Sequence, residues 1–173
     1  FYLTYRSNIN LANTYRKQGE DEKAIDAYEK VLRQKTHDGI RIKQALTLPI
    51  IYHDKKHIDN VRQRLIGMLD ALIEDKLVLQ DPALEISSTN FFLAYQAKSN
   101  REIQKTTAQV ILKSSPLLAF VAKHCITLQP VKEKIKIGFI SAYFRHHSIG
   151  RLMQGLIAEI SKQDFEVVVF TTR

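Results

Sequence analysis

A run of chemically active side chains lies between a strand-like segment and a helix-like segment near the end of the chain. It contains two aromatic rings, an arginine and two histidines: Tyr143, Phe144, Arg145, His146 and His147. A neutral imidazole can accept a proton or a hydrogen bond, and a guanidinium can bind an anion. The sequence therefore predicts a ligand-binding or catalytic loop at residues 142–147. The alternative is a solvent-exposed loop with a slight positive charge.

The segments on both sides of this loop have the pattern of a strand–helix–strand unit. Residues 135–141 and 165–170 predict strands, and residues 149–160 repeat apolar side chains at helical spacing, with Ser148 as the expected N-cap. In open α/β sheets, ligands bind where the carboxyl ends of parallel strands meet helix N-termini, which attract anions. The chain has no G-x-G-x-x-G motif and no P-loop, so a dinucleotide or Walker-type site is not predicted.

The first part of the chain has a regular spacing of small and large apolar residues. The spacing is carried by Leu11, Ala12, Tyr15, Gly19, Ala24, Tyr28, Val31 and Leu32. It resembles a tetratricopeptide repeat, in which glycine allows a tight turn and alanine lets two helices approach closely. Asn8 and Thr36 depart from the large aromatic and the proline of that pattern. The alternative is an ordinary amphipathic helical hairpin.

Helical periodicity continues to about residue 128. Helices are predicted within residues 40–76 with a break at Pro49, at Asn90–Gln96, after Asn100 as an N-cap, and at Leu117–Ala122. The rings of Phe91, Phe92 and Tyr95 are expected in the core. Gln129–Lys134 is the predicted seam before the first strand. These patterns divide the chain into helical repeats at 1–80, a helical segment at 81–130, and the start of an α/β lobe at 131–173.

The composition excludes several classes of protein. The net charge of +8 is spread along the chain without a basic block, so nucleic-acid binding is not expected. No apolar run is long enough to span a membrane. The single Cys125 excludes an intrachain disulfide and fits a reducing compartment, which predicts a cytoplasmic protein. His53 and His57 have a spacing that can chelate a metal, but no third ligand is near in the sequence and no metal is predicted.

These features together resemble one family. The repeat, the intervening helices, the segment Asn90–Gln96, and the strand and loop Ile135-Lys136-Ile137-Gly138-Phe139-Ile140-Ser141-x-x-Phe144-x-x-His147-Ser148-x-Gly150-Arg151-Leu152 are similar to those of the SPINDLY-like O-linked N-acetylglucosamine transferases. The resemblance implies a helical superhelix followed by the first βαβ unit of a Rossmann-like lobe of the glycosyltransferase B type. It also implies that these residues form part of a longer enzyme, inactive alone, whose second lobe holds most of the donor-binding residues.

The resemblance also implies roles for individual residues. His147 matches the family's loop histidine, an acid/base or substrate-orienting group, and is the expected catalytic residue. Phe144, Arg145, His146, Ser148 and Arg151 are the expected substrate-binding residues. Family members transfer a sugar, typically N-acetylglucosamine from a UDP-sugar, to Ser or Thr of protein acceptors that the superhelix binds, and no metal or other cofactor is expected. The alternative is a non-catalytic repeat scaffold that binds proteins.

Overall fold

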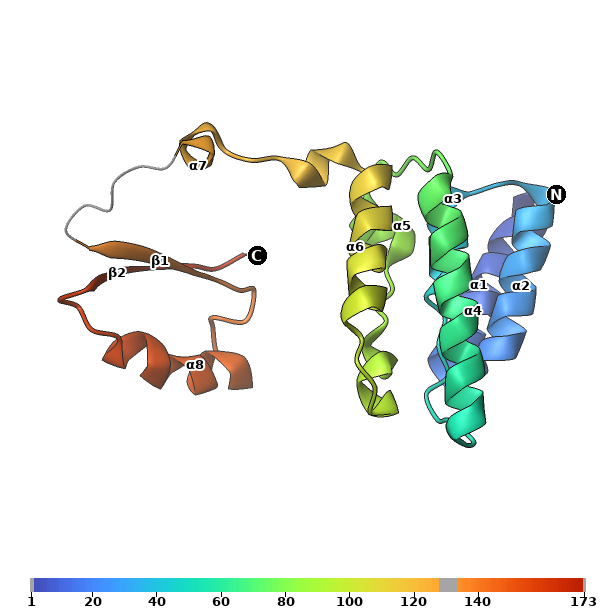
Figure 1. Ribbon diagram of the computed structural model, residues 1–173, viewed down its shortest axis with the longest axis horizontal. Coiled ribbons are helices and arrows are strands. Elements are labelled where there is room, and N and C mark those ends of the chain that lie inside the picture. The colour runs from blue at the N-terminus through green and yellow to red at the C-terminus, as the bar shows by residue number, and fades with distance from the viewer. Residues whose placement is uncertain (1, 128–133, 173) are drawn as a thin grey trace. The chain divides into compact units, whose positions relative to one another are not determined.

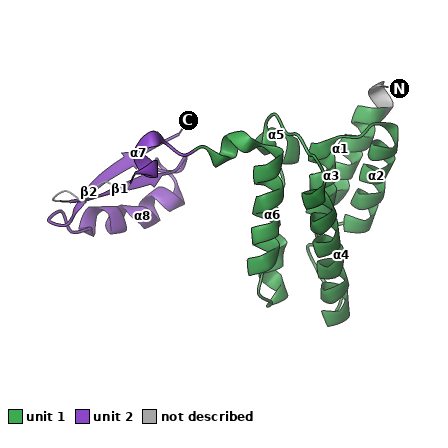
Figure 2. Ribbon diagram, turned by 45° about the horizontal axis from the view of Figure 1, so that its top comes forward, with its two compact units in different colours: residues 1–120 green, residues 121–173 purple. Residues whose placement is uncertain are grey.

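The computed structural model describes residues 2–127 and 134–172, and side chains from residue 5 onward. The chain divides into two compact units, residues 1–120 and residues 121–173 (Figure 2). The predicted seam at Gln129–Lys134 lies almost wholly outside the described residues. Residues 81–120 pack in the same unit as residues 1–80, so the two units differ from the three segments that the sequence suggested.

The first unit is helical (Figure 1). Its α-helices are α1 (Tyr2–Gln18), α2 (Asp21–Gln34), α3 (Asp38–Ala45), α4 (Lys55–Glu74), α5 (Pro82–Ile86) and α6 (Arg101–Ser114), and its 3₁₀ helices are η1 (Phe91–Gln96) and η2 (Pro116–Ala119). The apolar faces of α3, α4 and α6 contribute to one hydrophobic cluster, and Ile40 of α3 also packs in a second cluster with α1 and α2, so α3 links the two sets of helices.

Helices α1 and α2 form the predicted hairpin. Gly19 has φ +80°, a left-handed conformation that glycine adopts without strain, and it turns the chain between the two helices. Ala12 and Ala24 are fully buried, so the helices approach closely, and Tyr28 fills the space beside them. Leu11 was expected in this interface, but it is 43% exposed. The buried contact is made by the neighbouring Ala12, with Tyr15 packed against the same cluster.

Helices α4 and α6 form the second layer of the unit. The predicted helical period in α4 is confirmed, because Val61, Leu65, Leu69 and Leu72 are all buried on one face. Ile103 and Val110 of α6 pack into the same cluster. The helix before Pro49 ends earlier than the proline requires: α3 stops at Ala45, and the following residues remain buried as an irregular segment.

The segment Phe91–Gln96 is a 3₁₀ helix, and this changes which side chains are buried. Leu93 and Gln96 are three residues apart and point inward, as expected for three residues per turn. Phe91 and Tyr95 are 61% and 64% exposed, so the prediction that these rings lie in the core is wrong, while Phe92 is partly buried. Asn100 stands at the N-cap of α6 but its side chain binds Arg62 and the Leu93 carbonyl instead of capping.

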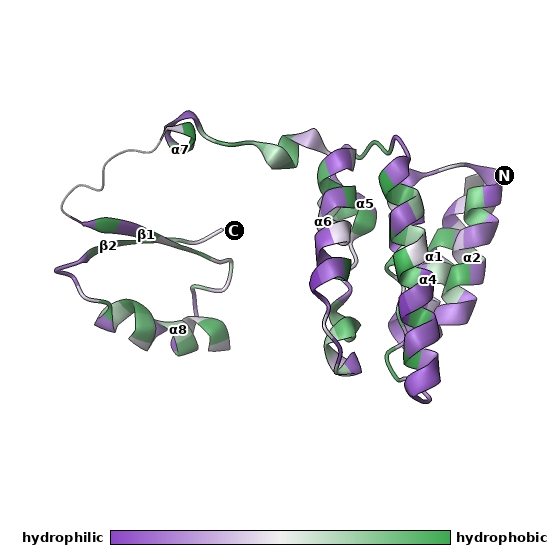
Figure 3. Cartoon of the chain, in the orientation of Figure 1, coloured by the Kyte–Doolittle hydropathy of each residue, from purple (hydrophilic) through white to green (hydrophobic). Residues whose placement is uncertain are grey.

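The second unit contains a short helix α7 (Lys123–Ile126) and a strand–helix–strand segment. Strand β1 (Ile135–Ile140) pairs in parallel with β2 (Phe165–Phe170), with Ile135 opposite Phe165 and Ile140 opposite Phe170. Helix α8 (Ser148–Glu159) connects them and is largely hydrophobic (Figure 3). The predicted βαβ unit is therefore confirmed, and the chain as a whole is mostly helical with a two-stranded parallel sheet.

No described residue of the second unit is fully buried. Leu152 and Leu156 on α8 are 80% and 55% exposed, and Phe170 at the end of β2 is 51% exposed. One helix on a two-stranded sheet encloses too little apolar surface to form a core like that of the first unit. No helix in the described part of the chain is both long and apolar enough to cross a membrane.

Candidate functional site

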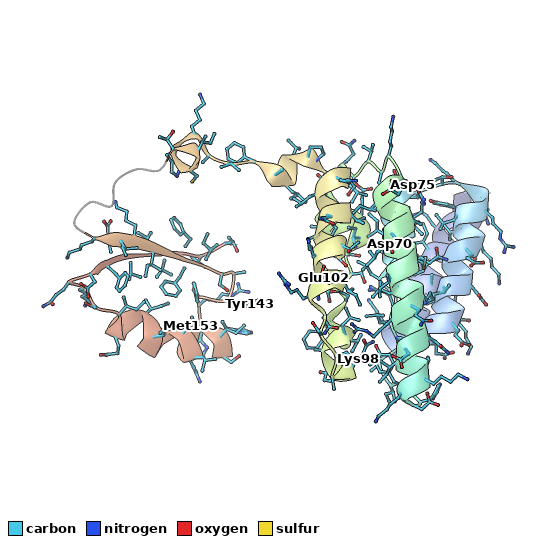
Figure 4. The ribbon with its side chains drawn as sticks, in the orientation of Figure 1. Asp70, Asp75, Lys98, Glu102, Tyr143 and Met153 are labelled. Atoms are coloured by element: carbon cyan, nitrogen blue, oxygen red, sulfur yellow. The ribbon has the colours of Figure 1, made fainter. Side chains whose placement is uncertain are left out.

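The loop between β1 and α8 holds the residues singled out by the sequence (Figure 4, near Tyr143). The N-cap of α8 is His147, not the predicted Ser148. Its Nδ1 accepts a hydrogen bond of 3.2 Å from the Ile149 backbone N–H, and its own N–H donates to the Arg145 carbonyl at 2.6 Å. Because the imidazole satisfies the helix end, Ser148 becomes the first helical residue, and its hydroxyl lies 3.5 Å from the same Nδ1.

This cap fixes the tautomer of the neutral His147 ring. A nitrogen that accepts a backbone N–H carries no proton, so the proton of the neutral imidazole is on Nε2. The ring is held in place by Tyr143, whose ring centroid is 4.5 Å away at an interplanar angle of 32°. His147 therefore presents a hydrogen-bond donor at Nε2, and the backbone already uses its acceptor atom.

Gly150 allows the loop to fold back on the first turn of α8. A Cβ atom at this position would lie 2.5 Å from the Arg145 carbonyl oxygen and 3.0 Å from the Tyr143 carbonyl oxygen. Both are backbone atoms, so a side chain could fit only if the loop moved. The sequence placed Gly150 in the segment that carries the family resemblance, and its steric role becomes visible in three dimensions.

A shallow hollow of about 580 Å³ opens beside this loop. It is lined by Phe144, Arg145, His146, Gly150, Arg151, Gln154, Ile157, Ala158 and Val169. Four of the six predicted site residues thus meet in one place, while His147 and Ser148 do not line it. Gln154 and Ala158 were missed, although their spacing of three and seven residues from Arg151 places them on the same face of the helix.

The hollow is lined by two positively charged arginines, and one of them is hydrogen-bonded to a lining histidine. Arg151 Nη2 lies 3.2 Å from Nε2 of His146, and because a guanidinium only donates, this imidazole nitrogen accepts. None of the lining residues is acidic, and neither arginine of the hollow forms an ion pair with a described residue. Together with the N-terminus of α8, this arrangement suits a weakly held anion with an apolar group against Val169.

The other candidate pair, His53 and His57, has a structural arrangement. The two rings stack with centroids 4.8 Å apart, and Nδ1 of His57 accepts the His53 backbone N–H at 3.2 Å. Asp54 caps α4 through the His57 N–H. Within residues 2–127 and 134–172, no group of three or more histidine, cysteine or acidic side chains could hold a metal ion.

One comparison with known proteins identifies part of the chain. Residues 9–42, which cover α1 from its middle, all of α2 and the first turns of α3, match the tetratricopeptide repeat family. The repeat predicted from the spacing around Gly19 is therefore confirmed, and repeats of this class act in protein–protein interaction. No curated protein and no solved structure matches the chain.

Proposed function

We propose that the chain binds protein segments through its helical unit and takes part, through the loop before α8, in transferring a sugar to the bound protein. The first half of this proposal is supported by the repeat match at residues 9–42. Since a repeat stacks on its neighbours and leaves one face open, its natural ligand is an extended protein segment.

Hydrogen exchange tests the protein-binding half. Peptides selected against the whole chain should slow exchange of backbone amides in α1 and α3, which start the two helix pairs. Amides in α6 should keep their rates and so serve as the internal control. Protection confined to α6 or to the second unit would contradict binding through the repeat.

The transferase half is supported by the loop and by the resemblance to SPINDLY-like enzymes. In such a transfer the acceptor hydroxyl oxygen attacks C1 of the sugar, the C1–oxygen bond to the diphosphate breaks, and the hydroxyl proton passes to an oxygen of the departing diphosphate or to water. Arg145, Arg151 and the α8 N-terminus would stabilise negative charge on the departing diphosphate. Because Nδ1 of His147 is occupied by the cap, the ring would orient the substrate through its Nε2–H. The alternative role, a general base, remains open, but Nε2 could accept a proton only if Nδ1 carried one, which would break the cap.

The decisive variants are His147→Asn and His147→Ala in the full-length protein, with the donor-binding lobe that the resemblance implies. Asparagine is a good N-cap without an imidazole, so it separates capping from chemistry. We expect both variants to bind the UDP-sugar and to lose most transfer to Ser or Thr. Unchanged turnover of His147→Asn with intact donor binding removes His147 from the mechanism. Absence of transfer in the unaltered enzyme with every UDP-sugar favours the non-catalytic scaffold.

Calorimetry on the 173-residue chain tests where the donor binds. Because the proposal places most donor contacts in the second lobe, we expect no micromolar binding of UDP-N-acetylglucosamine to these residues alone. Micromolar affinity would contradict that placement while leaving the protein-binding half intact. The single exposed Cys125 agrees with our proposal that the protein works in the cytoplasm.

A further inference from the structure

A hollow of about 230 Å³ lies between helices α4 and α6 of the first unit, and it is called the α4–α6 hollow below. Its floor is apolar, because Leu69 and Ile103 are 1% and 4% exposed and belong to the larger hydrophobic cluster. The residues that line it are Ile66, Leu69, Asp70, Glu102, Ile103 and Thr106. None of them belongs to the matched repeat or to the loop before α8.

Polar contacts hold the two helices together on both sides of the α4–α6 hollow. On one side, Arg62 donates from Nη1 to the side-chain oxygen of Asn100 and from Nη2 to the Ser99 carbonyl oxygen, each at 2.6 Å. On the other side, the Lys113 ammonium donates to the Ile73 carbonyl oxygen at 3.0 Å. The α4–α6 hollow is therefore preformed, and a ligand that enters it would not have to separate the helices.

Two carboxylates line the α4–α6 hollow, one from each helix (Figure 4). Asp70 of α4 forms no ion pair within the part of the chain that the structure describes. Glu102 of α6 has an exposed contact of 3.8 Å with Arg101, its neighbour in the sequence, which does not line the hollow. The lining also includes the hydroxyl of Thr106, a further hydrogen-bond acceptor, and no basic residue. The α4–α6 hollow therefore combines an apolar floor with negative charge.

This combination indicates which kind of ligand fits. An apolar floor favours a hydrocarbon stem, and the two carboxylates favour a positive charge at the end of that stem, as in arginine and lysine. A guanidinium is more weakly hydrated than an ammonium group and carries five N–H donors in one plane, so it suits acceptors that come from two helices. A purely apolar ligand would cover the carboxylates without replacing their hydration.

We propose that the α4–α6 hollow is a docking site for an arginine side chain of a partner protein. The methylene stem would lie on the apolar floor, and the guanidinium would donate to the carboxylates of Asp70 and Glu102. This site goes beyond the proposed function, which assigns protein binding to α1 and α3. Because the two sites lie on different helices, either one can fail while the other holds.

The first experiment titrates the whole chain with a blocked pentapeptide, Ala-Ala-Arg-Ala-Ala, and with a counterpart that carries citrulline in place of arginine. Citrulline has nearly the same shape as arginine but no charge. The methyl NMR signals of Ile66, Ile103 and Thr106 report binding. The arginine peptide should shift them to saturation with a Kd of about 1 mM, and the citrulline peptide should bind at least about tenfold more weakly, because exposed ion pairs are individually weak. Equal shifts by the two peptides, or no shift with either, overturn the proposal.

Variants of the chain locate the binding. Asp70→Asn and Glu102→Gln keep the shape of an exposed side chain and remove its charge, so each should fold with an unchanged Tm and bind the arginine peptide about threefold more weakly. Glu74→Gln is the matched control, because Glu74 is also exposed on α4 but does not line the α4–α6 hollow. Its affinity should stay within about twofold of the unaltered chain. Undiminished binding to Asp70→Asn and Glu102→Gln, or an equal loss in Glu74→Gln, overturns the site.

A lysine counterpart of the pentapeptide distinguishes a guanidinium site from a general cation site. Because an ammonium group is more strongly hydrated, the lysine peptide should bind at least about threefold more weakly than the arginine peptide. Equal or tighter binding of the lysine peptide overturns the assignment to arginine.

The same titration separates this site from the repeat. The arginine peptide should leave the backbone amide signals of α1 and α3 unchanged, and peptides without arginine should leave α6 unprotected, so α6 remains the control for binding through the repeat. Shifts confined to α1 and α3 would place the arginine on the repeat and overturn the α4–α6 site.

Discussion

Among single residues, Gly150 is the most tightly constrained by its surroundings. Gly150→Ala would bring a methyl group to 2.5 Å from the Arg145 carbonyl oxygen, and no side-chain rotation can relieve a backbone contact. We expect the loop to move, so that the NMR signals of His146 and His147 shift and the 3.2 Å contact between Arg151 and His146 is lost. Thermal unfolding of the second unit should occur at a lower temperature.

The matched control is Gly155→Ala, because a Cβ at Gly155 meets no atom within 4 Å. Both residues lie in α8, and alanine favours a helix over glycine by about 1 kcal/mol. Gly155→Ala should therefore stabilise α8 without moving the loop. Equal behaviour of the two variants would contradict the steric clash at Gly150.

Lys43 makes stability depend on pH in a predictable direction. Burial holds its pKa in the folded chain below the ordinary 10.5, so the unfolded chain binds more protons between those two values. The free energy of unfolding should consequently rise with pH through this window. Tyr28 has the opposite effect, because its pKa is raised by burial in the folded chain and it therefore lowers the free energy of unfolding as the pH rises above the ordinary 10.0. To keep the two effects apart, Tm is measured from about pH 8 to just below pH 10.

Lys43→Met supplies the comparison for this pH series. Without the titrating amine, its Tm should change less with pH than the Tm of the unaltered chain. Parallel curves for the two proteins would show that another group causes the dependence.

The sequence predicted which residues share the loop but not the hydrogen bonds that they form. Residue types and their place between a strand and a helix were enough to find Arg145, His146 and Arg151. The cap was assigned to Ser148 because serine is a common N-cap, whereas His147 fills that place here. The low exposure of Lys43, 6%, was not predictable, since lysine on an amphipathic helix is usually solvated.

At the level of elements, the contact between α3 and α5 depends on a glycine. A Cβ at Gly39 would lie 2.8 Å from Cβ of Glu85 and 3.1 Å from the Glu85 carbonyl oxygen. Gly39→Ala should therefore destabilise the first unit by about 1–3 kcal/mol, as overpacking usually does. Chemical denaturation monitored by circular dichroism measures the loss.

Gly67→Ala is the control for this prediction. Gly67 lies in α4, where an added Cβ meets nothing within 4 Å, so alanine should raise the free energy of unfolding by up to about 1 kcal/mol. A similar stabilisation by Gly39→Ala would mean that α5 is not packed against α3 as described.

Long periodic helices were predicted well, and short ones were not. α4 repeats its buried apolar residues from Val61 to Leu72, over about three turns, so its period predicts the buried face with little ambiguity. The segment Phe91–Gln96 offers only six residues, in which a period of 3.0 and one of 3.6 give different inward faces. The burial of Leu93 among residues of α4 and α6 decides between the two faces, and the local sequence carries no information about that packing.

For the molecule as a whole, the two units should differ sharply in stability. Core residues such as Leu65 and Leu69 of α4 are at most 1% exposed, whereas no described residue of the second unit is fully buried. Native-state hydrogen exchange should therefore show strong protection in α4 and α6 and weak protection in β1, β2 and α8. Equal protection in both units would contradict the burial pattern.

The division into units also shows what one-dimensional patterns cannot provide. The order of elements, the parallel pairing of β1 with β2 and the repeat at residues 9–42 followed from periodicity and spacing. The attachment of residues 81–120 to the preceding helices did not, because it depends on Ile86, Leu93 and Ile103 joining the cluster around α4. The amino-acid composition changes little around residue 80, so the sequence gives no sign of whether a domain boundary lies there.

The two-stranded sheet has a consequence for how the chain behaves in concentrated solution. Among the described residues β1 and β2 pair only with each other, which leaves one row of backbone donors and acceptors open on each strand. The β2 segment, Phe-Glu-Val-Val-Val-Phe, combines high strand propensity with a single charge. Open edges of this kind recruit strands from other molecules. The chain should therefore associate through these strand edges as its concentration rises, and samples should be kept dilute.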